Sequence, residues 1–165
     1  MDPSSQNIIS QDKLEQAALL YGLTDPFFEP QEALNFAKER NNYAKRAAKN
    51  NDNLRILLVF ADLLNLNIRT RDIETIEKKL ITADNDIKNA AILHCLTSKG
   101  ELSPLEAIHK VKSIDEELKP ITKCKDLRTL TILGMLVERN AEPVNIAKTL
   151  FSMQKLFNLE KKRER

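Results

Sequence analysis

Apolar residues recur at helical spacing along nearly the whole chain, and no segment alternates between apolar and polar positions long enough to predict a strand. This pattern predicts an all-α protein. The expected helices span residues 12–23, 30–49, 53–67, 71–83, 86–98, 104–118, 126–138 and 143–161.

Several of these helices have recognisable signals at their ends. Ser103 offers a capping hydroxyl, Pro104 fits the first helical position, and Glu106 supplies a carboxylate in the first turn. Gly100 follows the fifth expected helix, where a residue that tolerates positive φ can end the last turn. Each signal agrees with the helix boundaries that the periodicity predicts.

The chain also contains an internal repeat. Four units align when Leu14, Leu54, Ile87 and Leu127 are set at repeat position zero, with starts 40, 33 and 40 residues apart. Positions three, five, six and nine are then apolar in every unit, which is a broad face for one helix. Position one is always polar and holds Glu15, Arg55, Lys88 and Arg128. Position seven varies in size and holds Tyr21, Ala61, His94 and Gly134.

The repeat predicts four antiparallel helix hairpins stacked as an α-α superhelix or solenoid-like array, because stacking buries the broad face of each first helix. The alternative is an irregular helical bundle of unrelated helices. We expect one domain over residues 12–161, with units at 12–50, 53–84, 86–119 and 126–161. A flexible segment at residues 1–11 precedes the domain, and a basic tail at residues 162–165 follows it.

The last helix departs from what a terminal unit needs. A terminal unit should turn a polar face to water, but this helix carries apolar residues around much of its surface. They either complete the core or form a contact surface for a partner, including a second copy of the chain. The candidate interface residues are Phe151, Met153, Leu156 and Phe157.

Charge narrows the choice of partner. The 26 Lys and Arg residues nearly balance the 24 Asp and Glu residues, which excludes a broadly polybasic nucleic-acid binder. Local clusters remain, either as solvated faces or as contacts to phosphate groups. The candidate phosphate or nucleic-acid contacts are Lys45, Arg46, Lys49, Lys161, Lys162 and Arg163.

The sequence offers little for catalysis. Only 3 glycines occur, which disfavours a glycine-rich phosphate loop, and no spacing of His and Cys matches a metal site. His94 and Cys95 are adjacent on a helix, so their side chains diverge, while Cys124 lies between two lysines that favour its thiolate. We therefore expect no enzyme activity, no cofactor and no metal.

The amino end is polar and lacks the features of a secretory signal, and the longest apolar run, Ile56 to Ala61, is too short to span a membrane. Two cysteines fit a reducing cytoplasm. The resulting hypothesis is a cytoplasmic, non-catalytic protein–protein interaction module, such as an adaptor, scaffold, chaperone-like or assembly subunit. The alternative is a nucleic-acid-associated helical protein that uses the basic helix face and tail.

Overall fold

A computed structural model describes residues 13–25, 27, 29–66, 68–80 and 84–163, with side chains described up to residue 156. Over these residues the regular structure is entirely helical. The helices are α2 (Lys13–Thr24), α3 (Pro30–Ala48), α4 (Asp52–Leu63), α5 (Thr70–Glu77), α6 (Asn85–Thr97), α7 (Pro104–Leu118), α8 (Lys125–Val137) and α9 (Pro143–Arg163).

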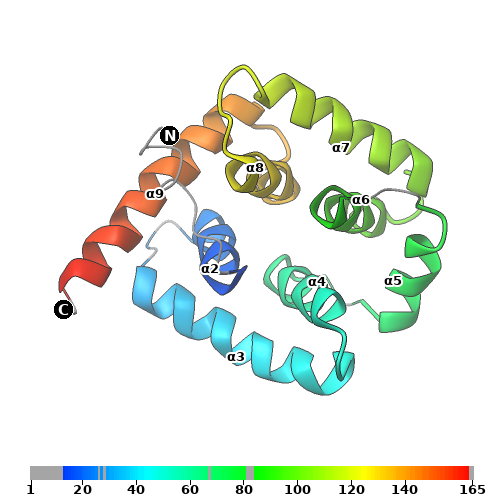
Figure 1. Ribbon diagram of the computed structural model, residues 1–165, viewed down its shortest axis with the longest axis horizontal. Coiled ribbons are helices and arrows are strands. Elements are labelled where there is room, and N and C mark those ends of the chain that lie inside the picture. Colours follow the sequence, from blue (N-terminus) through cyan, green and yellow to red (C-terminus); the bar gives the residue numbers. More distant parts are fainter. Residues whose placement is uncertain (1–12, 26, 28, 67, 81–83, 164–165) are drawn as a thin grey trace.

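The helices form two concentric layers. Figure 1 looks along α2, α4, α6 and α8, which lie side by side in the middle, while α3, α5, α7 and α9 surround them and lie across the view. The first helix of each repeat unit is thus an inner helix, and the second is an outer helix. This arrangement confirms the predicted all-α array and places its units in sequence order around one axis.

The array closes into a ring. Each inner helix packs against the next one along the chain, and α8 packs back against α2. Outer helices seal the seams: α3 packs on both α2 and α4, α7 on α6 and α8, and α9 on α8 and α2. The second unit is the exception, because α5 packs mainly on α6 of the following unit.

Closure explains the apolar character of the last helix. Ile146, Ala147, Leu150 and Met153 of α9 are buried in the same core as the inner helices. Because α9 covers the seam between the last and first units, its inner side packs against both α8 and α2. No solvent-facing cap is needed where the array has no free end.

One glycine lies at the seam where the ring closes. Gly134 of α8 lies where α2, α8 and α9 meet, and a Cβ atom placed there would be 2.8 Å from Ile146 Cγ2 and 3.1 Å from Leu23 Cδ1. The other units hold larger side chains at this repeat position, including Tyr21, which stacks on Phe36 with ring centroids 4.5 Å apart. At the seam where the ring closes, the side chains of Ile146 and Leu23 therefore fill the space that a side chain occupies in the other units.

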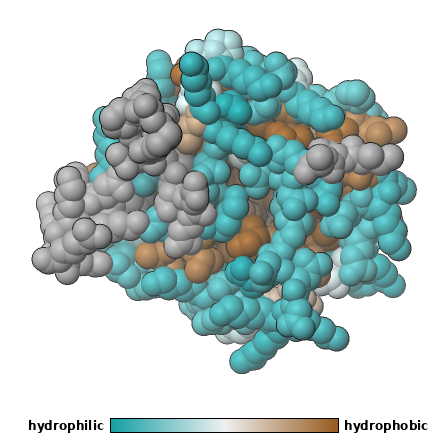
Figure 2. Space-filling view, viewed as in Figure 1, coloured by the Kyte–Doolittle hydropathy of each residue, from teal (hydrophilic) through white to brown (hydrophobic). Residues whose placement is uncertain are grey.

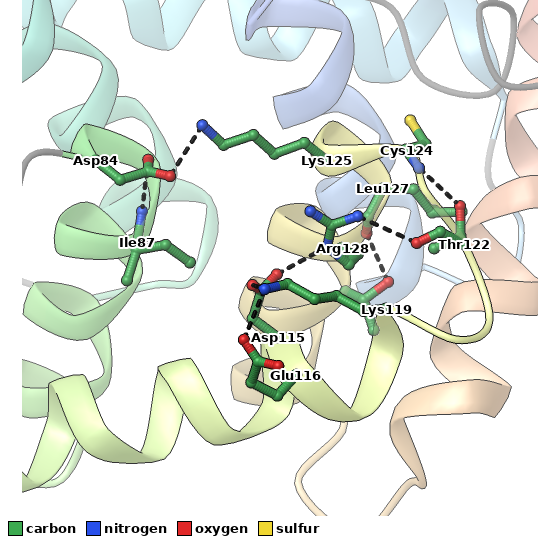
Figure 3. Close-up of polar contacts among 11 residues, drawn as sticks. Asp84, Ile87, Asp115, Glu116, Lys119, Thr122, Cys124, Lys125, Leu127 and Arg128 are labelled. Atoms are coloured by element: carbon green, nitrogen blue, oxygen red, sulfur yellow. Dashed lines mark hydrogen bonds and ion pairs between the residues drawn. The ribbon is translucent and has the colours of Figure 1, made fainter.

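The polar residue at repeat position one ties an inner helix to the preceding outer helix. Arg55 of α4 donates to Asn41 Oδ1 of α3, and Lys88 Nζ of α6 lies 3.8 Å from Glu77 Oε1 of α5. The strongest of these contacts joins α8 to α7, where Arg128 Nε donates to Asp115 Oδ1 at 2.9 Å (Figure 3). Three of the four units thus each have a polar contact at repeat position one that joins the inner layer to the outer layer.

The predicted helix-end signals are confirmed at two sites. Ser103 Oγ accepts a hydrogen bond from Glu106 N at 3.2 Å, and Gly100 has a φ of 92°. The helix expected over residues 71–83 instead ends at Glu77, because the chain tightens into turns at Lys79 and Leu80 that bury the latter side chain. The segment 1–11 and residues 164 and 165 of the tail lie outside the described residues.

Substituting Gly134→Ala is expected to destabilise the protein by about 1–3 kcal/mol, because the new methyl group meets Ile146 and Leu23 in a packed seam. Helix propensity alone predicts the opposite sign, since alanine exceeds glycine in a helix interior by about 1 kcal/mol. Urea unfolding measures the difference. Adding Ile146→Leu removes the Cγ2 methyl that is contacted, so the double variant should recover part of the loss; a stabilised single variant would contradict the proposed closure contact.

Removing the Arg128 contact should cost about 2–3 kcal/mol, because Arg128→Ala leaves the mostly buried Asp115 carboxylate without its main partner. Lys88→Ala is the matched control at the same repeat position, and its longer, more exposed ion pair predicts a loss below about 1 kcal/mol. Denaturant titration of both variants tests this ranking. Equal losses would show that the polar contacts are interchangeable.

Candidate functional site

The structure divides the candidate interface residues of α9 between core and surface. Met153 is only 8% exposed and belongs to the core, whereas Leu156 is 48% exposed. Phe151 is half-buried, and the ammonium group of Lys155 lies 4.6 Å from its ring centroid. The side chain of Phe157 lies outside the described residues. The accessible part of this predicted surface is therefore Phe151 and Leu156.

The basic candidates also fall into two groups. Lys45 and Arg46 are exposed in the last turn of α3, and Lys49 is exposed at its C-cap. The side chains of Lys161, Lys162 and Arg163 lie outside the described residues, although the α9 backbone continues through Arg163. Only the α3 cluster can be placed on a described surface.

The structure does not bring the candidate nucleophiles and bases together. His94 is buried, and its Nε2–H donates to Ile132 O of α8 at 3.2 Å. The Cys95 thiol donates a hydrogen bond to Leu102 O at 3.2 Å, and burial raises the pKa of that thiol. The two side chains therefore serve different neighbours, as their adjacency on one helix predicts.

Cys124 lies at the N-cap of α8, where its backbone N–H donates to Thr122 Oγ1 at 3.1 Å. Figure 3 shows the Lys125 side chain extending away from the Cys124 thiol toward α6, where its Nζ lies 2.9 Å from Asp84 Oδ2. Burial opposes ionisation of Asp84, but hydrogen bonds from Lys125 and two backbone N–H groups hold its pKa below the usual value. The Lys125 ammonium is thus committed to Asp84, which weakens the argument that it activates the thiol.

A surface groove appears on the one inner helix that its own outer helix leaves uncovered. The groove lies between α3 and α4 and has a volume of about 420 Å³. We call it the α3/α4 groove. Its lining is Arg40, Tyr43, Ala44, Ala47, Leu58, Ala61, Asp62, Asn65, Leu66 and Ile68.

Comparison of equivalent repeat positions explains the groove. Repeat position four is fully buried in three units, as Ala18, Ala91 and Thr131, whereas Leu58 at this position of the second unit is partly exposed. Leu58 lines the α3/α4 groove together with residues of α3. Because α5 has only 8 residues and packs mainly on α6, it does not cover this part of α4.

The walls of the groove combine apolar surface with a positively charged edge. Tyr43 is 56% exposed, and Arg40 lies over the Phe36 ring with its Nη1 3.7 Å from Asp62 Oδ2. Residues 38–49, which span the second half of α3 and its C-cap Lys49, carry five cationic side chains and one carboxylate. The groove can therefore accept an apolar stripe flanked by negative charge.

The groove was missed in the sequence, although a signal for it exists. Repeat position eight holds Gly22, Cys95 and Met135 in three units, but Asp62 in the second. A carboxylate in an otherwise uncharged column indicates a face that remains in water. This departure, together with the short spacing to the third unit, marks the exposed side of α4.

Among the described residues, no three His, Cys, Asp or Glu side chains gather closely enough to hold a metal ion. None of the described helices combines the length and apolar character that crossing a membrane requires. Comparison of the chain with protein-family models, with curated proteins and with solved structures finds no match.

The buried His94 predicts a loss of stability in mild acid. Burial lowers its pKa from 6.5 to about 4, and the nearby Lys110 ammonium acts in the same direction, against the hydrogen bond to Ile132. The unfolded chain therefore binds a proton that the folded chain excludes, so stability falls as pH drops from about 6.5 to about 4 by on the order of 3 kcal/mol.

Urea unfolding of the protein and of His94→Gln across this pH range measures the effect. Glutamine retains a donor for Ile132 O but does not titrate, so its stability should fall less steeply with acid. Parallel pH profiles for the two proteins would show that His94 does not cause the acid sensitivity.

Proposed function

We propose that this protein is a non-catalytic protein-interaction module whose α3/α4 groove accepts an acidic amphipathic helix from a partner protein. The observation that supports this proposal most directly is the uncovered face of α4. The inner helices α2, α6 and α8 are covered by the outer helices of their own units, whereas α4 presents partly exposed apolar residues beside α3. A helix from another chain would take the place that a longer α5 would occupy.

Helix lengths support a short ligand. The other outer helices, α3, α7 and α9, contain 19, 15 and 21 residues, whereas α5 contains 8. The differences are 7, 11 and 13 residues, or roughly two to four helical turns. We infer that the bound helix presents apolar residues on one face over about that length.

Charge supports an acidic partner. Lys45, Arg46 and Lys49 are exposed on the helix that forms one wall of the groove. Their field would accelerate association with a negatively charged segment and disfavour a basic one. On this proposal, Lys45, Arg46 and Lys49 contact carboxylates of the partner protein instead of phosphate groups.

The α9 candidates provide a smaller second surface in the proposal. The side chains of Phe151 and Leu156 are accessible to solvent, whereas the side chain of Met153 is buried in the core. We propose the cytoplasm as the location, because the structure contains two free thiols, Cys95 and Cys124.

A nucleic-acid-associated function is the second candidate, and the exposed Lys45, Arg46 and Lys49 on one helix favour it. Tyr43 is the aromatic side chain closest to them in sequence, so this surface offers little for base stacking. Binding would depend mainly on phosphate charge and would weaken steeply as salt increases.

Selection from a displayed library of helical peptides about three turns long tests the leading proposal. Enriched peptides should carry apolar residues at helical spacing with Asp and Glu beside them. Tyr43→Ala should weaken their binding about tenfold because it removes an apolar wall of the groove. Fluorescence anisotropy with labelled peptides measures the affinities.

Leu105→Ala is the matched control, since Leu105 is a similarly exposed apolar residue (63%) on α7, away from the groove. It should leave peptide affinity unchanged, while combined Lys45→Glu, Arg46→Glu and Lys49→Glu should weaken acidic peptides most at low salt. Equal effects of Tyr43→Ala and Leu105→Ala would overturn the groove assignment. Tight RNA binding that is lost in the triple variant but kept in Tyr43→Ala would favour the second candidate instead.

A further inference from the structure

A second cavity lies on the axis of the ring, at the end where the inner helices begin. Its volume is about 580 Å³, and all four inner helices contribute to its walls. We call it the axial pocket. Figure 2 has the same viewing direction as Figure 1 and shows hydrophobic surface among hydrophilic side chains over the middle of the ring. The pocket is separate from the α3/α4 groove, because the two share no lining residue.

The repeat divides the pocket into layers. Repeat position six supplies an apolar floor from Phe60, Leu93 and Leu133. Repeat position two, about one helical turn nearer the helix starts, supplies the middle layer from all four units. Three of those four residues are polar, so a molecule inside would meet apolar groups at one end and hydrogen-bonding groups at the other.

The middle layer contains a hydroxyl group without a partner. Thr129 is only 7% exposed, it lines the pocket, and its Oγ1 makes no hydrogen bond to any described residue. Asn89, in the same layer, is instead paired with Asn53 through two amide hydrogen bonds of 2.8 and 3.2 Å. A buried hydroxyl that lacks a partner is costly, and a polar group of a ligand would satisfy it.

The electrostatics of the mouth favour a negatively charged group. The starts of α2, α4 and α6 line it, and the first turn of a helix carries partial positive charge. Lys13 and Arg55 also line the mouth, and each is paired with a lining carboxylate: Asp86 Oδ1 lies 3.2 Å from Lys13 Nζ, and Asp52, whose side chain is 92% exposed, lies 3.7 Å from Arg55 Nε. The helix starts therefore supply the positive charge that the lining side chains leave unbalanced.

We propose that the axial pocket binds a small amphipathic carboxylate, with its apolar part against Phe60, Leu93 and Leu133 and its carboxylate beside the Thr129 hydroxyl. The volume lies in the range of small-molecule sites, and an apolar lining with a few polar groups is typical of them. Thr129 Oγ1–H donates to the carboxylate, and the partial positive charge of the helix starts at the mouth complements its charge. This proposal does not depend on the peptide-binding function.

Isothermal titration calorimetry with octanoate, below the concentration at which it forms micelles, tests the proposal. Octylammonium and octanamide serve as cationic and neutral probes with the same alkyl chain. Octanoate should saturate one site and bind more tightly than either. Thr129→Val keeps the side-chain shape, removes the hydroxyl and should weaken octanoate about tenfold.

Thr131→Val is the matched control on the same helix, because Thr131 Oγ1 donates to Leu127 O at 2.7 Å and does not line the pocket. It should lower the melting temperature without changing octanoate affinity, whereas Thr129→Val should leave the melting temperature of the unliganded protein unchanged or raised. Tyr43→Ala should also bind octanoate normally. Absent saturation, equal affinity for octylammonium, or an unaffected Thr129→Val would each overturn the proposal.

Discussion

The fold depends on the contact that closes the ring, where α8 and α9 pack against α2 around Gly134. The space beside this residue is filled by the side chains of Ile146 and Leu23, so a Cβ atom there would force a neighbouring side chain to shift. Closure gives every inner helix two inner neighbours and turns the apolar side of α9 into core. A linear array of the same helices would leave its first and last inner helices with one uncovered flank each.

Closure also sets the chemistry of the ring's axis. The inner helices begin at one end of the ring, so the positive ends of several helix dipoles lie close together. Acidic residues in the first turns, such as Asp52, Asp86 and Asp126, offset part of that charge. Burial raises the pKa of Asp126, and the neighbouring Asp86 acts in the same direction against Lys13. The charge at the mouth of the axial pocket therefore depends on the direction of the inner helices as well as on its lining residues.

The two proposed sites arise from different departures from the repeat. In the α3/α4 groove, one outer helix is too short to cover its own inner helix, and Asp62 marks the exposed face. In the axial pocket, repeat position two carries polar side chains inside the ring, and the Thr129 hydroxyl has no hydrogen-bond partner among the residues that the structure describes. Regular positions build the core, and irregular positions leave surfaces for binding.

The sequence predicted the helical segments, their ends and the repeat. These features could be predicted because helices, their caps and their apolar faces are set by residues within a few turns of one another. The cap at Ser103 and the positive φ at Gly100 are examples. The closed ring, the burial of Met153, the groove on α4 and the axial pocket came only from the tertiary structure. Each depends on contacts between residues far apart in the chain, such as Gly134 with Leu23. Hydropathy shows that a face is buried, but the geometry of packing decides which element buries it and which surface remains open.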